Sequence, residues 1–178
     1  MEERYKILIT GPFSSGKTTF IQTLSDTEFV STEEILSNGS SDGKKYTTVG
    51  IDFGKIIISD DLSIYLFGTP GQERFDFIWE DQINGSIAIM IMVDRSDFSS
   101  VMGAKNFVKF YTSRTNVPII IVANKSDLPS VISMEGMKQF FEPIVDCKIV
   151  ECVGKNKASA KDALYTVFFQ VILNEPVP

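Results

Sequence analysis

Six short runs along the chain are rich in residues that favour β-strands, and several of them are apolar almost without alternation. They are YKILI, GIDFGKIIIS, LSIYLF, SIAIMIMV, VPIIIVAN and CKIVECV. Such runs are typical of strands in a sheet that is covered on both faces. Helix-length stretches lie between them, at residues 17–25, 72–83, 98–114, 133–142 and 158–173. This order predicts a three-layer α/β domain with a mostly parallel six-stranded sheet and about five helices.

One strand of that sheet should be antiparallel. Only a tight turn at Asp60-Asp61 joins GIDFGKIIIS to LSIYLF, so these two runs should form a hairpin. Residues 37–45, SNGSSDGKK, read as a mobile loop. We find no internal repeat and no linker, and the 178 residues are expected to form a single domain over 1–178.

Composition excludes several classes of protein. A net charge of −6 argues against a non-specific nucleic-acid binder, which needs a basic face. The absence of histidine excludes histidine-based catalytic triads and histidine metal sites. The two cysteines, Cys147 and Cys152, are too few for a disulfide framework or a zinc site. Neither a signal peptide, a membrane-length apolar run nor a lipidation motif is apparent, so we expect a cytoplasmic protein without a lipid anchor.

The stretch GPFSSGKTTF, residues 11–20, is the strongest motif in the chain. It follows an apolar run, opens a helix, and matches G-x-x-x-x-G-K-[ST] at Gly11, Gly16, Lys17 and Thr18. In this pattern the loop's N–H groups and the helix N-terminus bind phosphate oxygens, the lysine reaches the outer phosphates, and the hydroxyl ligates Mg²⁺. Ser14, Ser15 and Thr19 complete the expected phosphate-binding set. The alternative is a Gly/Ser turn that binds nothing.

The stretch VANKSD, residues 122–127, contains N-K-x-D at the end of an apolar run. The Asp127 carboxylate can accept two hydrogen bonds from guanine, whereas adenine has no matching pair of donors and would leave the carboxylate unpaired. Lys125 can lay its alkyl stem along the base plane. Asn124 can tie the base loop to the phosphate loop. The sequence therefore predicts a guanine nucleotide, GTP or GDP, with Mg²⁺.

YTTVGIDFG and LFGTPGQERFDFIW complete a recognisable pattern. With them, the chain resembles Ras-superfamily small GTPases over nearly its whole length. The form TPGQ is similar to prokaryotic, MglA-like members, and TTVGIDF is similar to the Rab type. The resemblance implies a small G-domain with the P-loop NTPase fold.

The resemblance also implies residue roles. Thr48 would ligate Mg²⁺, Gly71 would donate its N–H to the γ-phosphate, and Gln72 would orient the attacking water, with Lys17 completing the catalytic set. Phe29 matches an aromatic that packs against the base, although an ordinary apolar residue after a helix is the alternative.

The last base-contacting loop aligns with Val153-Gly154-Lys155. The literal family triplet, Ser159-Ala160-Lys161, falls inside a predicted helix, and we interpret it as coincidental.

Two residues depart from the family pattern. Gly68 stands where the family has an aspartate that holds a metal-bound water, so a carboxylate must come from elsewhere. Asp52 and Asp94 are the candidates, unless both are structural. Phe13 stands where Ras has glycine, and its bulk should crowd an arginine inserted by an activating protein. Arg74 and Arg95 are alternative arginines within the chain, or ordinary surface residues.

We therefore expect a monomeric GTP-binding switch that hydrolyses GTP slowly. Effector proteins would bind at the two switch segments, about 37–50 and 68–82, and the MglA-like resemblance implies a roadblock-type regulator or a GTPase-activating protein. Phe75, Phe77 and Trp79 are either effector anchors or packing residues. Two alternatives stay open: a guanine-nucleotide scaffold with negligible hydrolysis, favoured by Gly68 and Phe13, and a P-loop nucleotide kinase, for which no arginine-rich lid is apparent.

Overall fold

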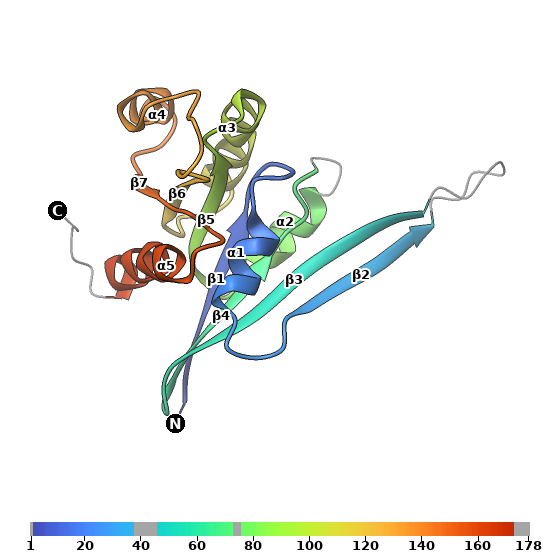
Figure 1. The fold of residues 1–178 in the computed structure, drawn as a ribbon. Helices are drawn as coiled ribbons and strands as arrows, with labels where there is room; N and C mark the ends of the chain where they lie inside the picture. The colour runs from blue at the N-terminus through green and yellow to red at the C-terminus, as the bar shows by residue number, and fades with distance from the viewer. Residues whose placement is uncertain (1, 38–45, 73–75, 173–178) are drawn as a thin grey trace.

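A twisted sheet runs through the centre of the domain (Figure 1). The computed structural model describes residues 2–37, 46–72 and 76–172. Within them the sheet has seven strands in the order β2-β3-β4-β1-β5-β6-β7. The strands are β1 (Glu3–Thr10), β2 (Val30–Ser37), β3 (Tyr46–Ser59), β4 (Leu62–Gly68), β5 (Ser86–Asp94), β6 (Ile119–Asn124) and β7 (Lys148–Glu151).

The sheet is mixed in the way that the sequence predicts. β3 pairs antiparallel with both of its neighbours, and the remaining pairs are parallel. The hairpin between β3 and β4 turns where Ser59 pairs with Leu62, which confirms the turn at Asp60-Asp61. The expected number of six strands is wrong, because β2 was not predicted. Its sequence, VSTEEILS, has a low apolar content and two glutamates, so its extended form comes from pairing with β3 rather than from local propensity.

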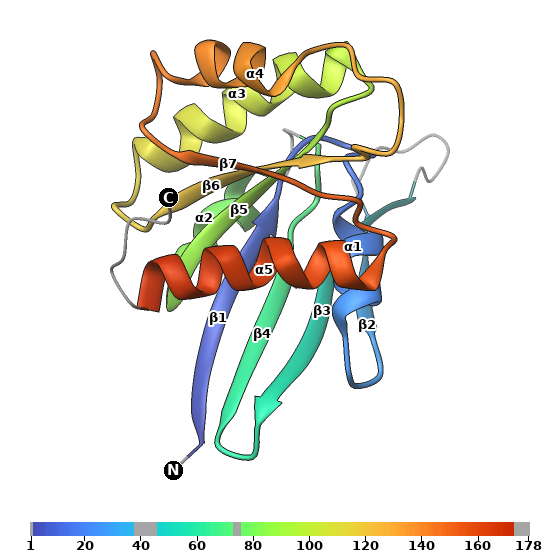
Figure 2. The same cartoon turned by 60° about the vertical axis from the view of Figure 1, so that its left-hand side comes forward.

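Five helices in the described part of the chain cover the two faces of the sheet. They are α1 (Lys17–Leu24), α2 (Asp76–Ile83), α3 (Phe98–Thr112), α4 (Met134–Phe141) and α5 (Lys157–Ile172). α1 and α5 pack on one face, where Ile7 and Ile9 of β1 are fully buried, and α2, α3 and α4 pack on the other with Leu8. Figure 2 shows α5 on the opposite side of the sheet from α3 and α4. This is the predicted three-layer α/β fold.

Side-chain caps fix where several helices begin. The Asp97 carboxylate accepts a hydrogen bond from the Ser99 N–H at the start of α3, and the Ser133 hydroxyl accepts one from Gly136 at the start of α4. No helix in the described residues is both long and apolar enough to cross a membrane.

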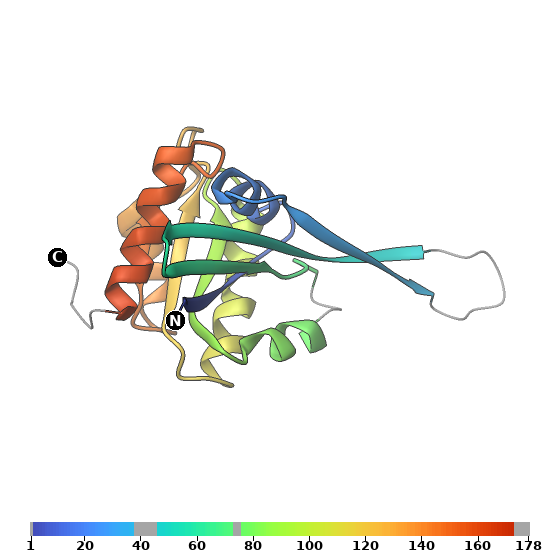
Figure 3. The same ribbon diagram turned by 90° about the horizontal axis from the view of Figure 1, so that it is seen from below.

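The β2–β3 hairpin extends beyond the body of the sheet. β4 ends at Gly68, which pairs with Asp52, so the part of β3 before Asp52 pairs only with β2. Figure 3 shows this two-stranded ribbon projecting away from the remaining strands. Part of the predicted loop at 37–45 joins its two strands, and residues 38–45 lie outside the described chain.

Candidate functional site

The loop between β1 and α1 is held close to its neighbours by its glycines. Gly11 and Gly16 have φ angles of +131° and +96°, which side chains rarely adopt. A methyl group on Gly11 would lie 2.2 Å from the Met92 carbonyl oxygen of β5, and one on Gly16 would lie 2.3 Å from Asn124 Nδ2. The loop therefore combines a left-handed backbone with close approach to β5 and β6, as expected for a loop whose N–H groups face a phosphate.

Lys17, the first residue of α1, places its ammonium inside this loop. Nζ donates to the carbonyl oxygens of Gly11 at 2.8 Å and Pro12 at 2.6 Å. Burial lowers the pKa of Lys17 to about 8, with the Asp52 carboxylate opposing this shift. Nζ also donates to the Ser15 hydroxyl at 3.5 Å, so these hydrogen-bond partners are all neutral, and a desolvated cation placed in this way is poised to bind an anion.

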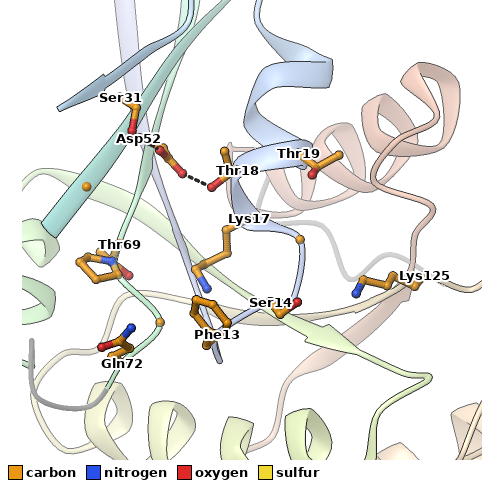
Figure 4. A pocket seen from close by; sticks show the side chains of 14 residues that line it. Phe13, Ser14, Lys17, Thr18, Thr19, Ser31, Asp52, Thr69, Gln72 and Lys125 are labelled. Atoms are coloured by element: carbon orange, nitrogen blue, oxygen red, sulfur yellow. Dashed lines mark hydrogen bonds between the residues drawn. The ribbon is translucent and has the colours of Figure 1, made fainter. Parts of the chain in front are cut away.

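A pocket opens in front of the loop (Figure 4). The structure brings together seven of the predicted phosphate-site residues along its walls: Ser14, Gly16, Lys17, Thr18, Thr19, Gly71 and Gln72. Ser15 is fully buried within the loop. Gly71 approaches closely, since a methyl group on it would lie 2.7 Å from Lys17 Nζ. Phe13 also lines the pocket and is 72% exposed.

Asp52 of β3 lies at the Thr18 end of the pocket. Its Oδ2 accepts the Thr18 hydroxyl at 2.5 Å, and its Oδ1 accepts the Ser31 hydroxyl at 3.0 Å. A methyl group on Gly68 would lie 2.9 Å from Asp52 Cβ and 3.4 Å from Oδ2. The Asp52 side chain therefore lies directly beside Gly68, next to Ile21 Cδ1, which would be 2.7 Å from the same methyl group. Of the two candidate carboxylates, the structure favours Asp52, because Asp94 is bonded to Lys125 instead.

The oxygen atoms at this end fit a magnesium ion. Thr18, Ser31 and Asp52 offer hydroxyl and carboxylate oxygens, which are the hard ligands that Mg²⁺ prefers. No group of three or more acidic, cysteine or histidine side chains in the described residues forms a metal cage. This absence is compatible with Mg²⁺ in nucleotide sites, because the ion is bound there by one or two side chains, phosphates and water.

Asn124 links the two loops of the site, as the sequence predicted. It ends β6 and is 3% exposed. Its Nδ2 donates to the Ser15 carbonyl oxygen at 2.9 Å, and its Oδ1 accepts the Gly154 N–H at 2.8 Å. One side chain thereby joins the phosphate loop to the loop after β7.

A smaller pocket adjoins this link. Its lining includes the predicted base-site residues Asn124, Lys125, Asp127 and Val153-Gly154-Lys155. The Asp127 carboxylate is paired with Lys155 Nζ at 2.6 Å, and this hydrogen bond lowers the pKa of Asp127.

The structure also reveals a supporting residue that sequence reasoning missed. The Ser159-Ala160-Lys161 triplet lies on α5, as interpreted, but the Ser159 hydroxyl accepts the Val153 N–H at 2.9 Å. Ser159 therefore supports the base loop from the first turn of α5. Its signal was available, because serine near a helix start commonly binds neighbouring main-chain groups.

Among the described residues, Phe29 and Arg95 do not line the two pockets. Thr48 pairs with Ile35 in the β2–β3 ribbon. Phe29 packs against the core on the α1 and α5 side, in agreement with its alternative interpretation as an ordinary apolar residue. Arg95 pairs with Glu151 at the ends of β5 and β7. Arg74 lies outside the described residues.

The aromatic residues after Gln72 divide between packing and exposure. Trp79 is 2% exposed, packs on Phe107 with ring centroids 4.2 Å apart, and donates its indole N–H to the Pro70 carbonyl oxygen at 2.8 Å. It is a packing residue. Phe77 is 54% exposed, and Phe75 lies outside the described chain.

Comparison with known proteins agrees with a nucleotide site of the P-loop type. Residues 9–168 match a family described as conserved hypothetical ATP binding protein. The chain belongs to this family. It is also 33% identical over 95 residues to the uncharacterized protein MJ1339 of Methanocaldococcus jannaschii, a match covering 53% of this chain and 54% of the relative.

A more distant similarity reaches a Ras-domain protein. Over 118 residues the chain is 26% identical to a Ras and EF-hand domain-containing protein of Danio rerio, covering 65% of this chain and 16% of that protein. The chain thus spans about half the length of the first relative and a small part of the second.

Proposed function

We propose that this member of the family binds guanine nucleotides with Mg²⁺ and acts as a switch that hydrolyses GTP slowly. The observation that carries the proposal is the position of the Asp127 carboxylate in a pocket joined to the phosphate loop through Asn124. A carboxylate at the base position favours guanine, whose N1–H and amino group supply two donors. Adenine offers no such pair of donors, and the carboxylate would keep only its pair with Lys155.

The family description names ATP, so the choice of base is the first point to test. Asp127→Asn should exchange the preferred base, because an amide offers a donor where the carboxylate offers only acceptors. We expect the variant to lose affinity for GDP and to gain affinity for XDP, whose base carries an oxygen at position 2 in place of the amino group. Asp97→Asn, at the α3 cap, is the matched control. Equal binding of GDP by Asp127→Asn and the native protein would refute the assignment of the base.

The hydrolytic part of the proposal uses the pocket in front of the phosphate loop. Lys17 would bind the outer phosphates, Gly71 would donate its N–H to the γ-phosphate, and Gln72 would orient water. Mg²⁺ held through the Thr18 hydroxyl would neutralise charge on the phosphate oxygens, with Asp52 accepting hydrogen bonds from its waters. Thr48, on the β2–β3 ribbon, would join this set when GTP is bound, and the ribbon would change position between the two nucleotide states, which is the switching movement that we propose.

Partner binding follows from the same movement. Effector proteins would bind the segments around Thr48 and Gln72 while contacts to GTP keep these segments ordered. After hydrolysis the segments would lose those contacts, and the effector proteins would dissociate. Phe13, exposed at the pocket, supports a slow reaction without an arginine inserted by a partner. A GTPase-activating protein or a roadblock-type regulator would then act by other means.

The second candidate is a guanine-nucleotide scaffold with negligible hydrolysis, which Gly68 and Phe13 favour. Phosphate release under multiple turnover separates the two functions. A GTPase releases more than one phosphate per protein and loses this activity in Gln72→Leu. A scaffold binds GTP and releases no phosphate above the level of the Gln72→Leu variant.

A further inference from the structure

A buried carboxylate at the end of β5 belongs to no role given above. Asp94 is 6% exposed and lies beside Asn124 in the β5–β6 pairing. Its Oδ1 accepts the Ser96 N–H at 2.9 Å and the Ser96 hydroxyl at 2.6 Å, and its own N–H donates to the Ser100 hydroxyl at 2.9 Å. These bonds fix the carboxylate at the carboxyl edge of the sheet.

The remaining oxygen of Asp94 holds Lys125. Oδ2 accepts Lys125 Nζ at 2.5 Å, within an ion pair that is largely withdrawn from water on the carboxylate side. Hydrogen bonds between opposite charges are among the strongest in proteins. A lysine with a flexible four-carbon stem is thereby restricted to one direction.

Lys125 occupies the junction of the two pockets. It lines both the pocket in front of the phosphate loop and the smaller pocket that contains Asp127. In Figure 4 it lies across the phosphate loop from Asp52. Its backbone has a φ of +58°, a left-handed conformation that persists only where surrounding contacts enforce it. The end of the Lys125 side chain is held by Asp94, a residue outside its own loop.

We propose that Asp94 is a positioning residue for the purine: by holding the Lys125 ammonium, it fixes the lysine stem as a wall of the base pocket. The inference rests on the proposed nucleotide site, but it does not depend on which purine binds, because the alkyl stem offers the same apolar surface to guanine and adenine. Under this proposal Asp94 increases the affinity for the purine and does not determine whether guanine or adenine is preferred.

A double-mutant cycle tests this inference with GDP as the probe. Asp94→Asn keeps the shape of the side chain and removes the charge, and Lys125→Met keeps the apolar stem and removes the ammonium. We expect Asp94→Asn to weaken GDP binding about tenfold, as for loss of one strong hydrogen bond. We expect Lys125→Met to weaken it by a similar factor and the double variant to bind no more weakly than Lys125→Met.

The cycle distinguishes positioning from a structural role. A carboxylate that only buttresses the loop before α3 would weaken binding in the Lys125→Met background as strongly as in the native protein. Two results would overturn the inference: equal weakening of GDP binding by Asp94→Asn in the native and Lys125→Met backgrounds, or a dissociation constant of Asp94→Asn for GDP within about twofold of the native value. Glu151→Gln is the matched control, since it breaks the neighbouring Arg95–Glu151 pair, and neither residue lines the two pockets. It should leave GDP binding unchanged.

Two further measurements keep the outcome decisive. Urea unfolding establishes that each variant is folded, and Asp94→Ser, which also removes the carboxylate that holds Lys125, replaces Asp94→Asn in the cycle if that variant does not fold. If the native protein prefers ADP, the proposed choice of base fails, and the same cycle measured with ADP decides the role of Asp94 separately. If the native protein binds no purine nucleotide, both proposals are refuted.

Discussion

Replacing Asn124 with alanine should destabilise the protein more than an ordinary polar substitution does. The Asn124 side chain is 3% exposed and satisfies two main-chain groups, the Ser15 carbonyl at 2.9 Å and the Gly154 N–H at 2.8 Å. Ser15 is fully buried, and Gly154 is buried as well. Each buried main-chain group left without a partner costs about 1–3 kcal/mol. We therefore expect Asn124→Ala to lower the free energy of unfolding by about 3 kcal/mol, allowing for partial access of water.

Urea denaturation followed by tryptophan fluorescence measures this change, because Trp79 is the only tryptophan. Asn156→Ala is the control, since the Asn156 side chain caps α5 through the Ser159 N–H at 3.0 Å in an exposed setting. That variant should lose about 1 kcal/mol or less. A loss below about 0.5 kcal/mol in Asn124→Ala would refute the reasoning, because it would mean that the link contributes little to holding the loops together.

Three other predictions concern the pocket, the thiols and Trp79 of α2. Gly71→Ala should weaken GTP binding at least about tenfold in a fluorescent-nucleotide competition, because the methyl group would lie 2.6 Å from the Phe13 main-chain nitrogen and 2.7 Å from the Pro12 carbonyl carbon; unchanged affinity would contradict this. Burial raises the pKa of Cys147 and of Cys152 from 9.0 to about 11, so at pH 8 both thiols should react with Ellman's reagent roughly a hundredfold more slowly in the native protein than in urea. Between pH 9 and pH 11 the thiols of the unfolded chain lose their protons, whereas those of the native protein keep them. The contribution of the two thiols to the free energy of unfolding is therefore fully present below pH 9 and is lost as the pH rises towards 11. Trp79→Phe removes the hydrogen bond to Pro70 and should cost about 1–2 kcal/mol in urea unfolding followed by circular dichroism, whereas no change would show that the bond is dispensable.

The strands and helices that form the core were predictable because local sequence and tertiary burial agree there. Runs such as SIAIMIMV are apolar on both faces, and β5 is buried along almost its whole length. α3 and α4 begin at capping residues that the sequence displays, Asp97 and Ser133. β2 was missed because its extended form is imposed by pairing with β3, and an isolated reading of VSTEEILS contains no such information.

The site divides in the same way. Residues contiguous in a motif, such as Gly16, Lys17 and Thr18, were found from spacing alone, since the loop and helix geometry places them together. Contacts between residues on elements that are distant in the sequence could not be predicted from spacing. The neighbour of Gly68 is Asp52, and that pairing depends on the register between β3 and β4. The bond between Asp94 and Lys125 likewise depends on β5 and β6 ending side by side.

Calorimetric titration of the nucleotide-free protein with GDP and with ADP, each with Mg²⁺, tests the central claim most directly. The account predicts that GDP binds at least about a hundredfold more tightly than ADP, because only guanine offers the Asp127 carboxylate a matching pair of donors. ADP binding as tight as that of GDP, or no heat from either nucleotide in protein shown to be folded, would contradict it.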